Sequence, residues 1–343
     1  MLGRQASNMQ EEIRRGRLRM VRDLARLFAP SAERLAEAYR GVLPELERVL
    51  RGLDDPLNPV YSEDDARQVV AIEAMRARIA RELRDLERVI ASQASTLQAG
   101  GVGVGIETGA ANMTAGGMGV AFNRPTVQSV VSAIDYVDSA AFRDAVGRLG
   151  TYHAEQIANL IISGQAQGQS PALIVRLARE YFTVRRTPEA DAYNLIQTTQ
   201  IYSARRGTQA VYLENGVSQW IWSANIGDAR TCRACIAMHG TVHPTTDVLN
   251  DHHRGRCAMV PVTPTWRELG FADGGEVPIE TGVDWFNRQD EATQRRAVGN
   301  NLLFEAIQRG EVAFSPDTIV GVYDNPIFGE MRRARSFREI IGQ

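Results

Sequence analysis

The chain has 343 residues, a formal net charge of -2 and 44% hydrophobic residues. This length accommodates two or three domains, and the near-neutral charge excludes a strong attraction of the whole chain to nucleic acid or acidic lipid. Three cysteines in so long a chain exclude a disulfide scaffold and favour synthesis in a reducing compartment. No apolar run reaches the roughly 18 residues of a membrane span and no hydrophobic signal core opens the chain, so we expect a soluble protein without a span.

Residues 1–97 read as an N-terminal helical bundle. Apolar residues recur every three or four positions over 8–52 and again from Ser62 to about Ser95. We expect a break at Ala29-Pro30-Ser31, and Ser62 followed by three acids is a good N-cap. The first helix is rich in arginine. Because the chain contains no lysine, arginine supplies the positive charge of all its basic segments. Its basic face is either a solvated face of the bundle, which we favour, or an arm for nucleic acid or an acidic partner.

Residues 98–137 are rich in glycine and alanine. Eight glycines fall between positions 100 and 119, with almost no charge around them. Glycine at that density disfavours regular helix or strand. The pattern predicts a flexible linker, which is apolar enough to lie against a partner or to pack as an irregular inner loop.

Residues 138–343 return to helical periodicity with a short β-segment inside. Helices are expected up to Gly164, from Ser170-Pro171, and from Thr187-Pro188 to Asn215-Gly216. The later elements expected are strands at 218–223, 241–243 and 258–263, a turn-rich loop at 274–281, a helix over 283–309, one turn at Ser315-Pro316 and a short basic helix at 332–341. The predicted fold class is α+β, mostly α, with an N-terminal helical domain, a glycine-rich linker and a C-terminal helical domain that holds a small zinc-stapled β-element.

The segment 220–261 contains all three cysteines and four of the five histidines. Cys232 and Cys235 form a C-x2-C pair, and Cys257 follows a histidine pair as H-x4-C or H-x3-C. Thiolates and imidazole at this spacing can close a tetrahedron around Zn²⁺. We predict a structural zinc site made by Cys232, Cys235, Cys257 and either His252 or His253. The alternative is a reduced, buried C-x2-C pair with surface histidines.

The second half also carries an ordered series of short motifs. They are G-x3-G-x-S at Gly164, Gly168 and Ser170, T-T-Q with a following alanine at Thr198, Thr199, Gln200 and Ala204, and N-G-V at Asn215, Gly216 and Val217. After them come Trp222, D-A-R-T-C-R-A-C at 228–235, Gly240, H-x4-C-x3-P at 252–261 and W-F-N-R-Q-x4-Q at 285–294. In this order and spacing, residues 138–340 resemble the Mu F-like minor head proteins of tailed bacteriophages, the phage head morphogenesis domain.

Two positions depart from the family pattern. The family often shows H-P-N-C-R-C where this chain has Gly255 in place of the first of those cysteines, and Gln200 stands where an acid is common. The first change limits the site to a Cys3His set unless His239 or His243 takes part. The family register favours His252 over His253 as the imidazole ligand.

The resemblance implies a minor head protein made in the bacterial cytoplasm and built into the virion, inside the head or at the portal vertex. It implies the phage portal and the major capsid protein as partners, a role in head morphogenesis, and DNA packaging or ejection as further roles. Contact with packaged DNA and self-association are also expectations, and no catalytic residue is implied.

An enzyme carried in the head is the alternative. A nuclease or transferase would use His239, His243 and Asp228 beside the metal, with phosphate held by Arg205, Arg206 or Arg230. Three thiolates favour a closed structural site over this one, and the lone helical His153 is best explained as a structural residue.

Overall fold

The computed structural model describes residues 2–115, 123–262 and 280–342 and is mostly helical, with 67% helix and 8% strand. Small antiparallel sheets lie near a cluster of cysteine and histidine side chains, which confirms the predicted fold class. The chain forms two compact units. The sheet unit comprises residues 1–25, 98–135 and 200–343, and the helical unit comprises 26–97 and 136–199. These units interleave in sequence, whereas the predicted domains 1–97, 98–137 and 138–343 are consecutive.

Three long helices contribute residues to both units: α1 (Leu2–Leu53), α3 (Arg84–Ala115) and α8 (Thr187–Glu214). The predicted break in α1 at Ala29-Pro30-Ser31 is wrong, because the helix continues through Pro30 and Pro44. A proline removes one helical hydrogen bond and crowds the preceding turn. Burial of Phe28 and Leu35 in the helical unit on both sides of Pro30 offsets this cost.

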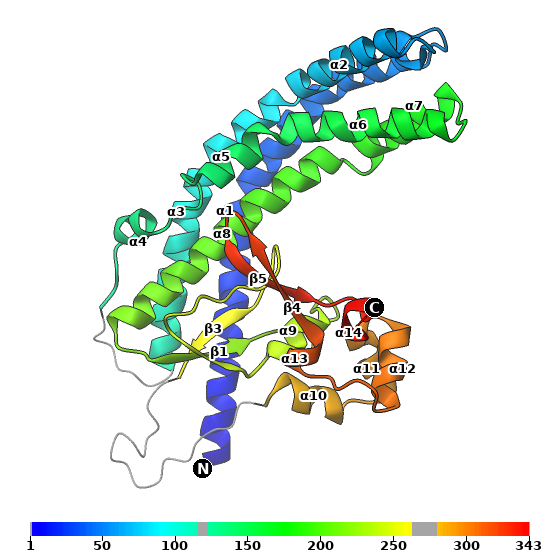
Figure 1. Ribbon diagram of the computed structural model, residues 1–343. Coiled ribbons are helices and arrows are strands. Elements are labelled where there is room, and N and C mark those ends of the chain that lie inside the picture. Colours follow the sequence, from blue (N-terminus) through cyan, green and yellow to red (C-terminus); the bar gives the residue numbers. More distant parts are fainter. Residues whose placement is uncertain (1, 116–122, 263–279, 343) are drawn as a thin grey trace. The chain divides into compact units, whose positions relative to one another are not determined.

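Besides parts of these three helices, the helical unit contains six elements: η1 (Pro59–Tyr61), α2 (Asp65–Glu82), α5 (Ala140–Gly147), α6 (Leu149–Ala166), α7 (Pro171–Arg179) and the π-helical turn η2 (Glu180–Val184). Helices α2 and α6 pack side by side (Figure 1). Asp64, not Ser62, caps α2. The predicted helix to Ser95 is two helices, because α2 ends at Glu82 with Leu83 as its C-cap and α3 begins at Arg84. Ser170 and Pro171 open α7 as predicted.

The glycine-rich segment is helical up to Ala115 in α3, which corrects the prediction of a flexible linker there. In the sheet unit Gly101, Gly105 and Gly109 lie against α8. A Cβ added at Gly105 would lie 1.8 Å from the carbonyl oxygen of Ala204, and one at Gly101 would lie 2.4 Å from that of Gln200. The glycines therefore allow two helix backbones to approach closely. Thr126 then caps α4 (Val127–Ala133), and the predicted linker residues 116–122 lie outside the described part of the chain.

The sheet unit contains a three-stranded antiparallel sheet in the order β2-β1-β3. Its strands are β1 (Gln219–Ser223), β2 (Val242–Pro244) and β3 (Ala258–Pro261), with α9 (Arg233–Met238) between the first two in sequence. Trp220 pairs with His243 and Trp222 with Met259, and both tryptophans are buried. The strands predicted from the sequence are confirmed within one or two residues at each end, apart from Thr263, which is not described.

The last part of the sheet unit differs more from prediction. The single helix expected over 283–309 is three helices, α10 (Gly282–Arg288), α11 (Glu291–Val298) and α12 (Asn301–Gln308). The side chains of Asp290 and Asn300 cap the second and third, and Gly299 has a left-handed φ of 65° between them. The predicted turn at Ser315-Pro316 is confirmed as α13 (Pro316–Ile319). Most of the loop expected at 274–281 lies outside the described residues.

The predicted basic helix at 332–341 is wrong over its first half. Residues 320–334 form a hairpin of β4 (Val320–Asn325) and β5 (Gly329–Ala334), and only α14 (Phe337–Ile340) is helical. The hairpin turns where Gly329 takes a φ of 73°, and Met331 is buried. Within residues 2–115, 123–262 and 280–342, every helix is too short or too polar to cross a membrane.

His153 in the helical unit makes the stability of this unit depend on pH. It is completely buried on α6, with Nδ1 2.5 Å from the Tyr181 hydroxyl and Nε2 3.6 Å from Oδ2 of Asp191. Burial lowers the pKa of His153 from 6.5 to about 4. Between these values the unfolded chain binds the extra proton, so stability is lost as the pH falls from about 6.5 to about 4, by at most about 3 kcal/mol.

We therefore expect the urea midpoint of the wild type to fall more between pH 7 and pH 4.5 than that of His153→Gln, followed by circular dichroism. An equal fall in both proteins would contradict this account of His153.

Candidate metal centre

Cys232 and Cys235 lie at the N-terminus of α9. Cys232 is the N-cap residue of this helix, and its Sγ accepts a hydrogen bond from the backbone N–H of Cys235 at 3.4 Å. The preceding turn is closed by Thr231, whose hydroxyl donates to the carbonyl of Asn225, and by Asp228, which accepts from the backbone N–H of Arg230. The C-x2-C spacing therefore places both sulfurs on the first helical turn.

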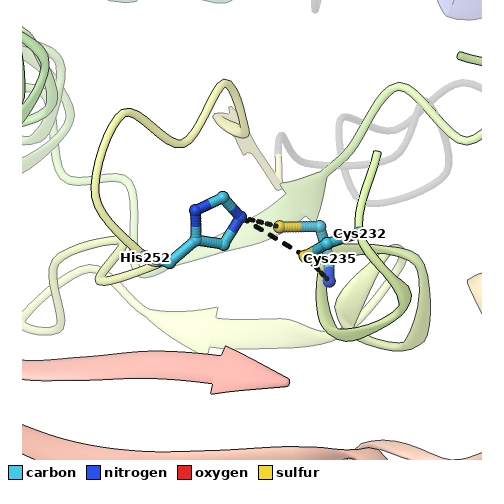
Figure 2. Close-up of side chains that lie close together, drawn as sticks. All are labelled: Cys232, Cys235 and His252. Atoms are coloured by element: carbon cyan, nitrogen blue, oxygen red, sulfur yellow. Dashed lines mark hydrogen bonds between the residues drawn. The ribbon is translucent and has the colours of Figure 1, made fainter. Parts of the chain in front are cut away.

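His252 faces these sulfurs from the loop between β2 and β3 (Figure 2). Its Nε2 lies 3.3 Å from Sγ of Cys232 and 3.5 Å from Sγ of Cys235. A tetrahedral zinc ion with usual Zn–S and Zn–N bond lengths has an S···N edge of about 3.5 Å, so these separations fit a shared ion. Nδ1 of His252 donates to the carbonyl of His253 at 2.9 Å, which orients the ring and reserves Nε2 for a metal.

Cys257 approaches the same site from the start of β3. Cys235, Cys257 and Asp251 each offer one ligand atom within 4.8 Å of the others, as do Cys232, Cys235 and His252. The two trios share Cys235. The cluster of Cys232, Cys235, His252 and Cys257 is buried and could hold a metal ion, as the sequence predicted. Asp251 was not predicted, because nothing in its local sequence distinguishes it from a surface acid.

The three side chains nearest to each other in the cluster differ in how readily they lose a proton. Hydrogen bonding from Cys235 lowers the pKa of Cys232 to about 4, with His252 acting in the same direction. The hydrogen bond with Cys232 raises the pKa of His252 to about 9. Hydrogen bonds with Cys232 and Cys257 together with burial raise the pKa of Cys235. The lowered pKa of Cys232 therefore favours metal binding, whereas a metal ion would have to displace a proton from both His252 and Cys235.

The other histidines of the segment contact β1 and its neighbours instead. Nδ1 of His239 accepts from the backbone N–H of Ala224 at 3.0 Å, and burial lowers the pKa of His239 to about 4. His243 stacks on Trp220 with ring centroids 4.5 Å apart. His253 meets the ring of Phe328 edge-on at 6.1 Å. None of the three belongs to either metal-capable trio of the described residues.

The basic residues suggested for phosphate binding also have protein partners. Arg205 makes a buried ion pair with Asp251 at 2.6 Å, and Arg206 donates to the Gln209 side chain at 3.1 Å. Arg230 pairs with Asp228 at 2.9 Å, and the hydrogen bonds from Arg230 hold the pKa of Asp228 well below its usual value.

Arg17 is a further contributor to the surroundings of the site that sequence reasoning missed. It comes from the arginine-rich first helix, which was expected to be solvated or to face a partner, yet its side chain is buried in the sheet unit. Its guanidinium donates to the carbonyl of Ala224 at 2.6 Å and to the side chains of Ser223 and Asn225. It thereby holds the turn that leads from β1 to Cys232. No local signal separates Arg17 from its exposed neighbours.

Comparisons with known proteins add nothing to this geometry. No family model, curated protein or solved structure matches the chain.

The two adjacent histidines provide a matched test of the metal centre. We expect His252→Gln to lose bound zinc and His253→Gln to retain it, because only Nε2 of His252 lies against the sulfurs. Zinc per chain, measured by atomic emission on both purified proteins, decides the point. Equal zinc in the two variants would remove His252 from the site.

Proposed function

We propose that the Cys/His cluster is a structural zinc centre in a non-enzymatic assembly protein of a phage head. The observation that carries the proposal is that both donor trios meet at the buried Cys235, so that α9 and the loop before β3 converge on one point. A zinc ion there would join two segments that are otherwise linked by the short strands of the sheet and by the ion pair of Arg256 with Asp228.

A structural role fits the donors better than a catalytic one. Structural zinc sites use four protein ligands rich in cysteine, whereas catalytic sites keep one position open to water. Cys232, Cys235, His252 and Cys257 complete a Cys3His set. His239 and His243, the proposed acid–base groups of a nuclease or transferase, are engaged with β1 and Trp220. We therefore favour an assembly protein over the enzyme.

The assignment to a phage head rests on the motif series of residues 138–340. Its two most specific members, D-A-R-T-C-R-A-C and H-x4-C, form the turn before α9 and the loop that faces it. This convergence supports the resemblance to minor head proteins. On this proposal the chain associates with the portal or the major capsid protein of its phage and resides in the virion.

Two measurements test the proposal separately. Purified full-length protein should carry about one zinc per chain, as expected for one site, and heads purified from the phage whose genome encodes the chain should contain it at far fewer copies than the capsid protein. Protein purified without metal, and unable to take up Zn²⁺, would refute the zinc centre. Absence of the chain from intact heads, measured by quantitative mass spectrometry, would refute the head assignment.

A further inference from the structure

The loop between β2 and β3 carries a buried carboxylate that the Cys3His set leaves unexplained. Asp251 is 1% exposed, and one of its oxygens lies within 4.8 Å of the sulfurs of Cys235 and Cys257. A carboxylate this deep is costly unless cations neutralise it. Cys235 and Cys257 would each add a negative charge as thiolates, so the site would then need still more positive charge.

Arg205 of α8 satisfies only part of this need. Its Nη1 lies 2.6 Å from Oδ1 of Asp251, while Nη2 donates to the carbonyl of Gly255 at 3.0 Å. Arg205 therefore contacts the loop backbone as well as the carboxylate of Asp251. Oδ2 of Asp251 has no hydrogen-bond partner among residues 2–115, 123–262 and 280–342. A fully buried oxygen of this kind is normally paired, and a bound cation would pair it.

Gly255 keeps the carboxylate in this position. A Cβ at residue 255 would lie 2.0 Å from Oδ2 and 2.2 Å from Oδ1 of Asp251. Any larger residue would push the carboxylate out of the space beside the sulfurs. Glycine at 255 and the anchored Arg205 together hold Asp251 against Cys235 and Cys257.

We propose that Asp251 supplies an oxygen donor to the metal ion of the cluster; this rests on the metal centre proposed above. The donor set then has five members, one more than the Cys3His set, with Cys235 shared between Cys232 and His252 on one side and Cys257 and Asp251 on the other. A carboxylate oxygen among thiolates and imidazole suits Zn²⁺ and Co²⁺. Arg205 supplies the counter-charge for the additional anion.

Co²⁺ titration of the full-length protein tests the proposal, because the visible bands of Co²⁺ report the atoms bound to it. The variants are Asp251→Asn, Arg205→Gln and the double variant Arg205→Gln/Asp251→Asn. The double variant removes both buried charges together, so it avoids the unpaired arginine that could unfold the single Asp251→Asn protein. Asp247→Asn, an exposed acid of the same loop, is the matched control.

Asp251→Asn and the double variant should show shifted Co²⁺ bands and at least about tenfold weaker binding. Arg205→Gln keeps the Asp251 oxygen but removes its anchor, so it should shift the bands less than Asp251→Asn, and Asp247→Asn should retain the wild-type bands. If binding weakens in the Asp251 variants but their bands equal those of the wild type, Asp251 is only the partner of Arg205 and the inference is overturned. A wild-type protein that binds neither Co²⁺ nor Zn²⁺ would instead refute the metal centre itself.

Discussion

Cys235→Ser is expected to abolish zinc binding and to give one of the largest losses of stability of any single substitution in the sheet unit. Cys235 belongs to both donor trios and is buried between them. A serine hydroxyl does not ionise at neutral pH and cannot replace the thiolate. Structural zinc contributes on the order of 10 kcal/mol to the folding of small domains. This is comparable to the whole stability of an ordinary domain.

Chelation separates the loss of metal from the loss of packing in this variant. We expect a strong chelator to lower the thermal midpoint of the wild type to about that of Cys235→Ser, and to leave the variant unchanged. Differential scanning calorimetry with and without chelator measures both. A chelator that shifts the two proteins equally, or neither, would show that the thiol matters for packing and not for a metal.

The Cys/His cluster was partly predictable because its main signals are local. The C-x2-C pair lies within one helical turn, where the spacing alone brings the sulfurs together. The choice between His252 and His253 depended on the direction of each ring, which the sequence leaves open and the structure resolves in favour of His252. The burial of Asp251 in its loop depends on a partner, Arg205, that comes from α8. Nothing in a single sequence indicates that two residues from separate elements form such an ion pair.

In the fold, too, features set by neighbouring residues were predicted correctly, and features set by contacts between distant residues were missed. Ser170-Pro171 and Asn215-Gly216 were predicted correctly as helix boundaries, because capping and left-handed glycine conformations are properties of the few residues involved. The glycine-rich half of α3 was mistaken for a linker, since its helical state depends on α8 about 100 residues away. The hairpin β4–β5 was missed because the adjacent arginines Arg332 and Arg333 of β5 favoured a basic helix over a strand.

The glycines of α3 allow this last explanation to be tested. Gly105→Ala is expected to destabilise the sheet unit by on the order of 3 kcal/mol, the upper range for overpacking. The new methyl group would lie 1.8 Å from the backbone oxygen of Ala204, which no side-chain rotation can relieve, so α3 and α8 must separate. Loss of their packing would outweigh the gain of about 1 kcal/mol in helix propensity.

Gly103→Ala is the matched control, two residues away on the same helix. Its Cβ would meet only a methyl group of Val127, at 3.8 Å, which is ordinary contact. This variant should therefore gain stability, by up to about 1 kcal/mol, through helix propensity alone. Urea midpoints of the two variants should move in opposite directions from the wild type. If Gly105→Ala were as stable as Gly103→Ala, the close approach of α3 and α8 would not hold in solution, and a flexible segment would again be the better description of residues 98–115.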